Sequence, residues 1–284
     1  MGKGKIRNIE GFPMYLSKTL TGLSAKLHGD GFHEPAFMWL LRKEAKGNLA
    51  LDIGSNIGYS TLSLCKNMKR VIAIEPDDRS RKVLKHNLKL NNFRDKVDIR
   101  DYAISDVVGR KDFYISKHPN LSAFHKNKKF WFERRRIKTV TIDSLNVLPN
   151  FIKMDLEGHE VEVIRGGMNS LDNTKFCRIL LEVHPSFYTE DHTFADSMKD
   201  LFDIGYNVKY LVSAGVACPD EFKNKGYKPF KIFEIGGFER GIYREVTNED
   251  ALNFATKIYN QAISNTGKIS KKIVRAIMLE KDIL

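Results

Sequence analysis

The chain has few cysteines and no long apolar segment. Cys65, Cys177 and Cys218 are the three cysteines of its 284 residues, and they stand far apart. An odd number at such spacing does not suit a disulfide framework, so we expect reduced packing residues of a cytoplasmic protein. No apolar run is long enough to cross a bilayer, and the basic N-terminus lacks the apolar core of a secretory signal. Cysteine and histidine do not cluster at zinc-ligand spacing, so no zinc site is expected.

Positive charge is in excess. Lys and Arg number 47 against 35 Asp and Glu, a formal net charge of +12. Part of the excess lies in residues 117–138, where Phe124, Phe130, Trp131 and Phe132 are interleaved with Lys and Arg. Such a mixture favours RNA or another polyanion as a partner. The alternative is a solvated loop whose aromatic rings pack against the core, and the sequence leaves both open.

The segment LALDIGSNIGYS, residues 49–60, predicts a strand, a glycine turn and a helix. The apolar run 49–53 has the length of a strand that is buried on both faces. Gly54 and Gly58 bracket a turn, and the helix is expected over 59–68. Such a turn is expected to direct free backbone N–H groups at one point beyond the strand, where open α/β sheets bind ligands.

Two acids suggest which ligand binds there. Asp52 ends the first strand, and a carboxylate at that point would repel a pyrophosphate but attract a cation. The next strand, 71–74, ends in Glu75, at the spacing from which an acid reaches ribose hydroxyls. S-adenosylmethionine, with its ammonium, sulfonium and ribose, fits both acids. The structural alternatives are a helix cap for Asp52 and a solvated strand end for Glu75.

The element pattern predicts an α/β fold with a mostly parallel, seven-stranded sheet, one antiparallel edge strand and helices on both faces. We expect an extension over 1–32, one domain over 33–263 that contains the basic insertion 117–138, and a basic amphipathic tail over 264–284. Strands are expected over 49–53, 71–74, 97–104, 111–116, 138–142, 151–156, 178–183, 207–213 and 230–235. Helices are expected over 33–45, 59–68, 78–90, 159–165, 194–204 and 248–263. The tail suits a surface helix or a contact with a partner.

Several segments together resemble the FkbM-type S-adenosylmethionine-dependent methyltransferases, which have the Rossmann-like class I methyltransferase fold. They are DIGSNIGYS, the Glu75-Pro76 strand end, AISDVVG, IKMDLEGHEVEVIRGG, LLEVH and YREVTNEDALNFA. The resemblance spans roughly residues 34–256. It implies S-adenosyl-L-methionine as cofactor. The residues it implies for the methionine part are Asp52, Gly54, Ser55, Asn56 and Gly58. Glu75 and Pro76 would hold the ribose, Asp101 with Tyr102 or Ala103 would face the adenine, and Asp155 is also included.

Methyl transfer to an alcohol needs a base, because an alcohol holds its proton tightly. The polar groups at the ends of the fourth and fifth core strands are the candidates: Asp155, Glu157, Glu182 and His184. His184 has the intrinsic pKa best suited to a base at neutral pH. The same oxygen-rich group could instead hold Mg²⁺, although no ligand spacing demands it, and we assign no metal.

The sequence therefore predicts O-methylation of a hydroxyl on a small molecule, sugar or glycan. The alternative is a ribose 2′-O-methyltransferase that holds RNA with the basic aromatic insertion. Lys153, Asp155 and Glu182 partly match a Lys-Asp-Lys-Glu arrangement, but its second Lys has no counterpart.

Overall fold

The computed structural model describes residues 3–18, 20, 22–126, 131–188, 193–235, 237–259, 261–262 and 269–283. Phe130 of the basic insertion and residues 264–268 of the expected tail lie outside this set. Among the described residues, none of the helices combines the length and the hydrophobicity that a membrane span requires.

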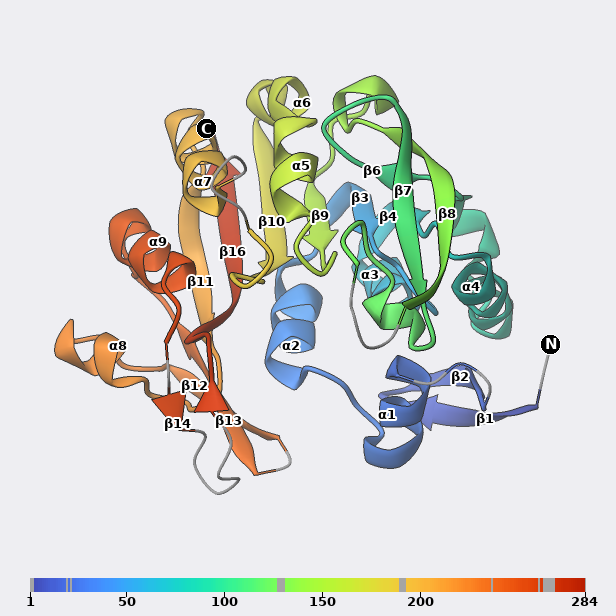
Figure 1. Ribbon diagram of the computed structural model, residues 1–284, viewed down its shortest axis with the longest axis horizontal. Coiled ribbons are helices and arrows are strands. Elements are labelled where there is room, and N and C mark those ends of the chain that lie inside the picture. Colours follow the sequence, from blue (N-terminus) through green and yellow to red (C-terminus); the bar gives the residue numbers. More distant parts are fainter. Residues whose placement is uncertain are drawn as a thin grey trace.

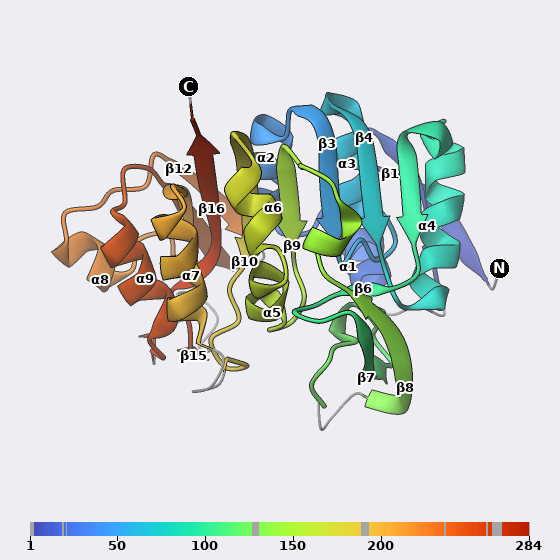
Figure 2. The ribbon, with the colours of Figure 1, turned by 90° about the horizontal axis from the view of Figure 1, so that it is seen from above.

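A twisted sheet forms the centre of the molecule (Figures 1 and 2). Within the described residues it has nine strands in the order β12-β13-β11-β16-β10-β9-β3-β4-β5. The five strands from β10 to β5 are parallel. The bounds are β3 Gly47–Ile53, β4 Met68–Ile74, β5 Val97–Arg100, β9 Phe151–Met154, β10 Phe176–Glu182, β11 Asn207–Ser213, β12 Lys231–Ile235, β13 Phe238–Tyr243 and β16 Val274–Asp282.

The chain adds β4 and β5 on one side of β3, and β9 and β10 on the other. Strand order therefore reverses between β3 and β9, which opens a crevice beyond their carboxyl ends. This arrangement confirms the predicted α/β fold. The sheet is mixed, with nine strands in the described residues rather than the seven expected, and the pairings from β12 to β10 are antiparallel.

Helices cover both faces of the sheet because consecutive strand residues point to opposite faces. Ala50 packs with α2 (Pro35–Glu44), α3 (Tyr59–Asn67) and α4 (Asp78–Leu90) in one apolar cluster. Its neighbour Leu51 packs on the other face with α5 (Glu160–Arg165), α6 (Met168–Asn173), α7 (Phe194–Asp203) and α9 (Asn248–Thr256). A short helix, α8 (Asp220–Asn224), lies between β11 and β12.

The residues before the sheet fold against it. A hairpin, β1 (Gly4–Ile9) and β2 (Phe12–Ser17), and the helix α1 (Leu23–Asp30) contribute Ile9, Phe12, Met14 and Leu27 to the cluster around α2 and α3.

A second, three-stranded sheet in the order β6-β8-β7 lies beyond the carboxyl ends of the central strands (Figure 2). Its strands are β6 (Ala103–Ile104), β7 (Gly109–Ser116) and β8 (Trp131–Val140). The expected strand 97–104 is thus divided between two sheets. Most of the described second half of the basic insertion is regular strand rather than loop.

The C-terminal residues differ most from expectation. The expected helix over 248–263 ends at Thr256, and Gln261–Ala262 form the short strand β14, paired with β15 (Ile269–Ser270). The expectation of a surface helix or partner contact is wrong for β16. This strand lies inside the sheet, antiparallel to both β10 and β11. It is thus an interior strand that runs against the parallel set, where the sequence predicted only one antiparallel strand, at the edge.

Candidate active site

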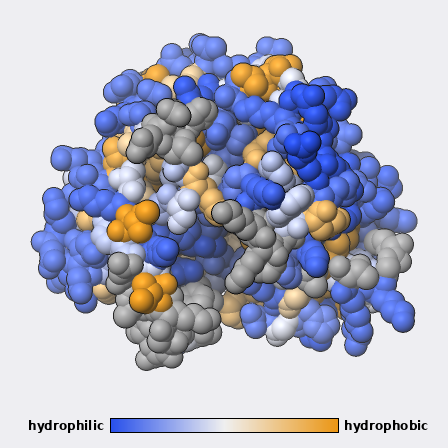
Figure 3. Space-filling view, in the orientation of Figure 1, coloured by the Kyte–Doolittle hydropathy of each residue, from blue (hydrophilic) through white to orange (hydrophobic). Residues whose placement is uncertain are grey.

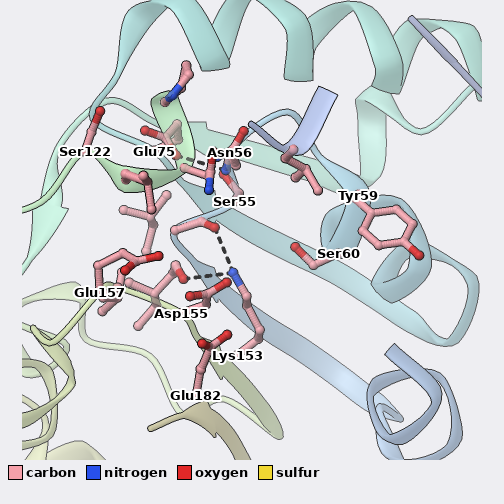
Figure 4. Close-up of a pocket in the computed structure, with 18 of the residues that line it drawn as sticks. Ser55, Asn56, Tyr59, Ser60, Glu75, Ser122, Lys153, Asp155, Glu157 and Glu182 are labelled. Atoms are coloured by element: carbon pink, nitrogen blue, oxygen red, sulfur yellow. Dashed lines mark hydrogen bonds between the residues drawn. The ribbon is translucent and has the colours of Figure 1, made fainter. Parts of the chain in front are cut away.

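A cavity of about 340 Å³ lies at the reversal of strand order, beyond the carboxyl ends of β3, β4, β9 and β10. Its lining divides into two groups of polar side chains (Figure 4). Ser55, Asn56 and Glu75 lie together on one side, and Asp155, Glu157 and Glu182 lie together on the other. Of the residues expected at the site, those that line the cavity are Gly54, Ser55, Asn56, Glu75, Pro76, Ala103, Asp155, Glu157, Glu182 and His184.

Gly54 allows β3 to turn beside β9. Its φ of +78° is in the left-handed region, and a Cβ there would lie 2.6 Å from the carbonyl oxygen of Asp155. The first three N–H groups of this turn are paired rather than open. Gly54 and Ser55 both donate to the carbonyl of Ile74, at 3.0 and 3.1 Å, and Asn56 N–H donates to Glu75 at 2.9 Å. These three N–H groups are therefore not open to a ligand, whereas Ser55 and Asn56 themselves line the cavity.

Asp52 does not line the cavity. Its carboxylate is fully buried and accepts hydrogen bonds from the hydroxyls of Ser60 at 2.8 Å and Thr61 at 2.6 Å. Lys153 Nζ lies 3.5 Å from the same carboxylate and donates to the carbonyl of Gly54 at 2.7 Å. Asp52 thus connects β3 to the first turn of α3, a role similar to the helix cap that was its structural alternative. Its placement does not support direct attraction of a cationic ligand.

Glu75 lies at the cavity wall, and its carboxylate is held in place by backbone N–H groups. Its two carboxylate oxygens accept N–H bonds from Asn56 and, at 2.8 Å, from Asp77, which fixes the side chain. Burial raises the pKa of Glu75 to about 7, and the nearby Asp77 adds to the rise. Beside it, the hydroxyl oxygen of Ser55 is buried and has no hydrogen-bond partner among the described residues. The two carboxylate oxygens of Glu75 and the Ser55 hydroxyl therefore lie beside the same cavity.

Only one of the three residues expected to face the adenine lies at the cavity. Ala103 lines the cavity together with Ile104, whereas Asp101 is exposed and Tyr102 lies in the core, and neither lines the cavity. Gly58 also stays outside the lining. It begins α3 with a φ of +95°, and a Cβ there would lie 2.6 Å from Leu84. Asp101, Tyr102 and Gly58 therefore do not contact the cavity, and their placement does not support the cofactor contacts predicted for them.

His184 is clamped between carboxylates. Its Nδ1 lies 3.1 Å from Glu160 and its Nε2 lies 3.0 Å from Glu182. Burial alone would lower the pKa of His184, but Glu160 and Glu182 outweigh it and raise the pKa to about 10. An imidazolium that donates both protons is a poor acceptor at neutral pH. This environment argues against His184 as the general base.

Glu157 and Asp155 have the opposite environment. Burial raises the pKa of Glu157 to about 7, with Asp155 and Glu182 adding to the rise and His184 opposing it. Burial, and next Glu182, raise the pKa of Asp155 as well. Glu157 has a φ of +53°, an uncommon conformation for a residue with a side chain, and Gly158 follows at +101°. The chain therefore bends after β9, and the Glu157 carboxyl group lines the cavity. This group gains a proton near neutral pH.

Three residues of the site were missed. Arg275, from the start of β16, contacts Glu182 at 2.6 Å and Glu34 at 3.1 Å. Despite burial, these acids raise the pKa of Arg275, and Arg275 in turn helps to hold the pKa of Glu182 well below its usual range. Glu160 reads in the sequence as an ordinary acid in a first helical turn, and no local signal distinguishes Arg275 or Glu34.

A divalent cation is the remaining option for this group. Single ligand atoms of Asp155, Glu157 and His184 lie within 4.8 Å of one another. His184 would have to lose a proton before it could ligate, which its two carboxylate partners oppose.

Comparison with known proteins adds independent information. The family model described as "Methyltransferase FkbM domain" matches residues 52–208, more than half of the chain. A curated relative, "Hexuronic acid methyltransferase AglP" from Haloferax volcanii, is 30% identical over 160 residues, which is 54% of this chain and 63% of that protein.

Two solved methyltransferase structures match the chain at low sequence identity. Methyltransferase FkbM from Methylobacillus flagellatus KT matches with 19% identity and a TM-score of 0.37, over 60% of this chain and 46% of that one. Precorrin-6y C5,15-methyltransferase from Geobacter metallireducens GS-15 matches with 12% identity and a TM-score of 0.42, over 96% of each chain. The chain thus spans less than two thirds of the curated relative and about half of the FkbM structure.

Proposed function

This chain belongs to the FkbM methyltransferase family, and from this premise we propose that it uses S-adenosylmethionine to methylate a hydroxyl oxygen of a sugar, glycan or other small molecule. The relative from Haloferax volcanii, whose name gives a hexuronic acid as the acceptor, supports a sugar. Because that match spans 63% of the relative, the acceptor is part of the proposal.

The cavity fits this cofactor. Glu75 offers a fixed pair of acceptor oxygens for ribose hydroxyls, and the Ser55 hydroxyl has no other partner among the described residues. Ala103 and Ile104 supply an apolar wall, and Asp155 supplies a carboxylate for an ammonium group. When bound, S-adenosylmethionine supplies a methyl group on a positively charged sulfur.

The protein must then align the acceptor and take up its proton. We assign the proton transfer to Glu157, whose pKa near 7 suits a base at neutral pH. Glu182 is unsuited because Arg275 and His184 hold its pKa well below the usual range. Arg275 and the protonated His184 keep positive charge beside the cluster, so Glu182 stays ionised while Glu157 titrates. The observation that supports the mechanism is the contrast in contacts: Glu182 lies 2.6 Å from Arg275 and 3.0 Å from His184, whereas Glu157 lies 3.9 Å from His184.

Transfer to RNA has less support. A Lys-Asp-Lys-Glu mechanism needs a lysine at the acceptor hydroxyl, but the Lys153 ammonium is held by the carbonyl of Gly54 and by Asp52.

The test is transfer of a labelled methyl group from S-adenosylmethionine to uronic acid glycosides, neutral glycosides and RNA. We expect label in the glycosides and a kcat/KM that rises with pH through about 7. Glu157→Gln should reduce kcat about 100-fold or more and abolish this rise. Label found in RNA alone would contradict the proposal.

Stability supplies the control. Because its folded pKa lies above the ordinary 4.5, ionised Glu157 costs stability as pH rises from about 4.5 to about 7. Glu157→Gln should therefore be more stable than wild type at pH 8, by about 1–3 kcal/mol in denaturant unfolding. Loss of activity together with gained stability separates a catalytic role from misfolding. Full activity of the variant would transfer the role of base to Asp155.

A further inference from the structure

The three-stranded sheet has two unlike faces. Its register pairs Arg110 with Lys138, Asp112 with Arg136, and Tyr114 with Arg134, and directly paired residues share a face. These six residues are called the outer face below. Their neighbours along each strand point the other way, toward the body of the protein.

The inner face is packed and neutralised. Phe113 is buried there and lines the cavity. Arg135 pairs with Glu133 at 2.6 Å and with Asp78, at the start of α4, at 2.9 Å. The inner face thus anchors the sheet over the active site.

The outer face is exposed and positive. Its four basic side chains are exposed, and Asp112 contacts Arg134 at 3.3 Å. Arg110 and Arg136 each donate to the other's carbonyl, at 3.4 and 3.5 Å, which holds the two guanidinium groups over adjacent strands. Within the described part of the chain, Arg110, Arg136 and Lys138 have no carboxylate partner. Figure 3 shows strongly hydrophilic atoms at the upper right, where Figure 1 places β7 and β8.

Like charges that share one face repel one another unless an anion lies between them. Guanidinium groups bind carboxylates and phosphates through two parallel hydrogen bonds, so this face suits a ligand with repeated anionic groups. The aromatic rings fit nucleic acid less well. Tyr114 and Trp131 contact each other edge to face at 5.8 Å, and Lys126 Nζ lies 4.5 Å from the Trp131 ring. Phe132 is 49% exposed, and the Arg79 guanidinium lies 5.3 Å from its ring. These cations would compete with a base for the ring faces of Trp131 and Phe132.

The same sheet connects this face with the cavity. The segment between β7 and β8 contributes Asn120, Leu121, Ser122 and Phe124 to the cavity wall. The cavity lies on the inner side of the sheet and the basic residues lie on its outer side, so this segment joins two separate surfaces.

We propose that the outer face binds the carboxylates of an acidic glycan that carries the acceptor hydroxyl, at a surface separate from the cavity. This rests on the proposed function for the identity of the acceptor, but the binding itself does not require methyl transfer.

The test measures binding of the full chain to fluorescent oligogalacturonate and to neutral dextran of equal length, over a range of salt concentrations. The variant is Arg110→Gln, Arg136→Gln and Lys138→Gln combined. Its matched control is Lys69→Gln, Arg70→Gln and Lys89→Gln, which removes the same charge from exposed positions away from the cavity. We expect the first variant to bind oligogalacturonate about tenfold more weakly with a flatter salt dependence, and the control to bind as wild type does.

Three results would overturn the proposal: equal binding by the first variant and wild type, equal loss in both variants, or tighter binding of a single-stranded RNA of equal charge that the first variant loses. Methyl transfer to a uronic acid monosaccharide, measured in parallel, tests the proposed function separately. If oligogalacturonate binding depends on the outer face but no methyl is transferred, the proposed function fails and the binding surface stands.

Discussion

At the scale of single residues, the site depends on giving chemically similar carboxyl groups different pKa values. Asp155, Glu157, Glu160 and Glu182 crowd around His184, and burial alone would favour the neutral form of every acid. Cations decide the outcome. Glu182 contacts Arg275 and stays ionised, whereas Glu157, 3.9 Å from His184, has a pKa of about 7.

The protonation of His184 can be measured directly, and it reports the balance between burial and the neighbouring carboxylates. Its pKa of about 10 predicts that both ring nitrogens carry protons at pH 8, which nitrogen NMR of the imidazole reports. Because the folded pKa is raised, His184 stabilises the fold fully below its ordinary value of 6.5, and this contribution is lost as pH rises through about 10. Glu160→Gln should lower the pKa by at least about one unit, since the largest favourable partner is removed. A neutral His184 at pH 8 in wild type would contradict this arrangement.

The sequence predicted which side chains meet at this point but not their protonation. Asp155, Glu157, Glu182 and His184 follow two adjacent parallel strands, so their proximity follows from local patterns. Their pKa values depend on Arg275, which is 93 residues beyond Glu182 in the chain and has no local signal.

At the scale of elements, the turn after β3 is the feature that local sequence determines most fully. Two conditions require glycine at position 54: the positive φ, and the approach of the Asp155 carbonyl from β9. Gly31, which ends α1, shares the first condition with a φ of +75°, but a Cβ at this position would have no other atom within 4 Å. Substitutions at Gly54 and Gly31 therefore separate the stability cost of backbone strain from the cost of the close contact.

We expect Gly31→Ala to cost about 1–2 kcal/mol of unfolding free energy, the cost of a left-handed residue with a side chain. Gly54→Ala should cost more, about 2–4 kcal/mol, because β3 and β9 must also move apart. Denaturant unfolding measures both. Gly54→Ala should weaken S-adenosylmethionine binding in calorimetry, and Gly31→Ala should leave it unchanged. Equal costs for the two variants would show that the contact with Asp155 is relieved elsewhere.

Element boundaries were predicted well where the pattern is local. The helix Asp78–Leu90 and the strand Asn207–Ser213 have the expected bounds. The strand β8 was obscured because charged residues occupy most of positions 133–138, a composition that reads as loop. Burial alternates along this strand, but its sequence shows no alternation of apolar and charged residues that could have predicted it.

At the scale of the whole molecule, the final strand holds the two halves of the sheet together. β16 pairs with β10 on one side and β11 on the other, and most of its residues from Val274 to Met278 are buried. The sequence Ala-Ile-Met-Leu is rich in helix formers, so its propensity indicated a helix. A place between two strands that are remote in sequence overrides that propensity, and no local pattern encodes it.

This role can be tested by comparing two apolar side chains of the C-terminal segment. Leu279 is fully buried and lies opposite Ile179 of β10 and Val208 of β11, whereas Ile283 is 56% exposed beyond the strand. Leu279→Ala should cost about 2–5 kcal/mol in denaturant unfolding, since it leaves a cavity between the two halves of the sheet. Ile283→Ala should change stability by no more than about 0.5 kcal/mol. If both substitutions proved nearly neutral, the segment would be a peripheral tail, and Arg275 would lose the strand that brings it to Glu182.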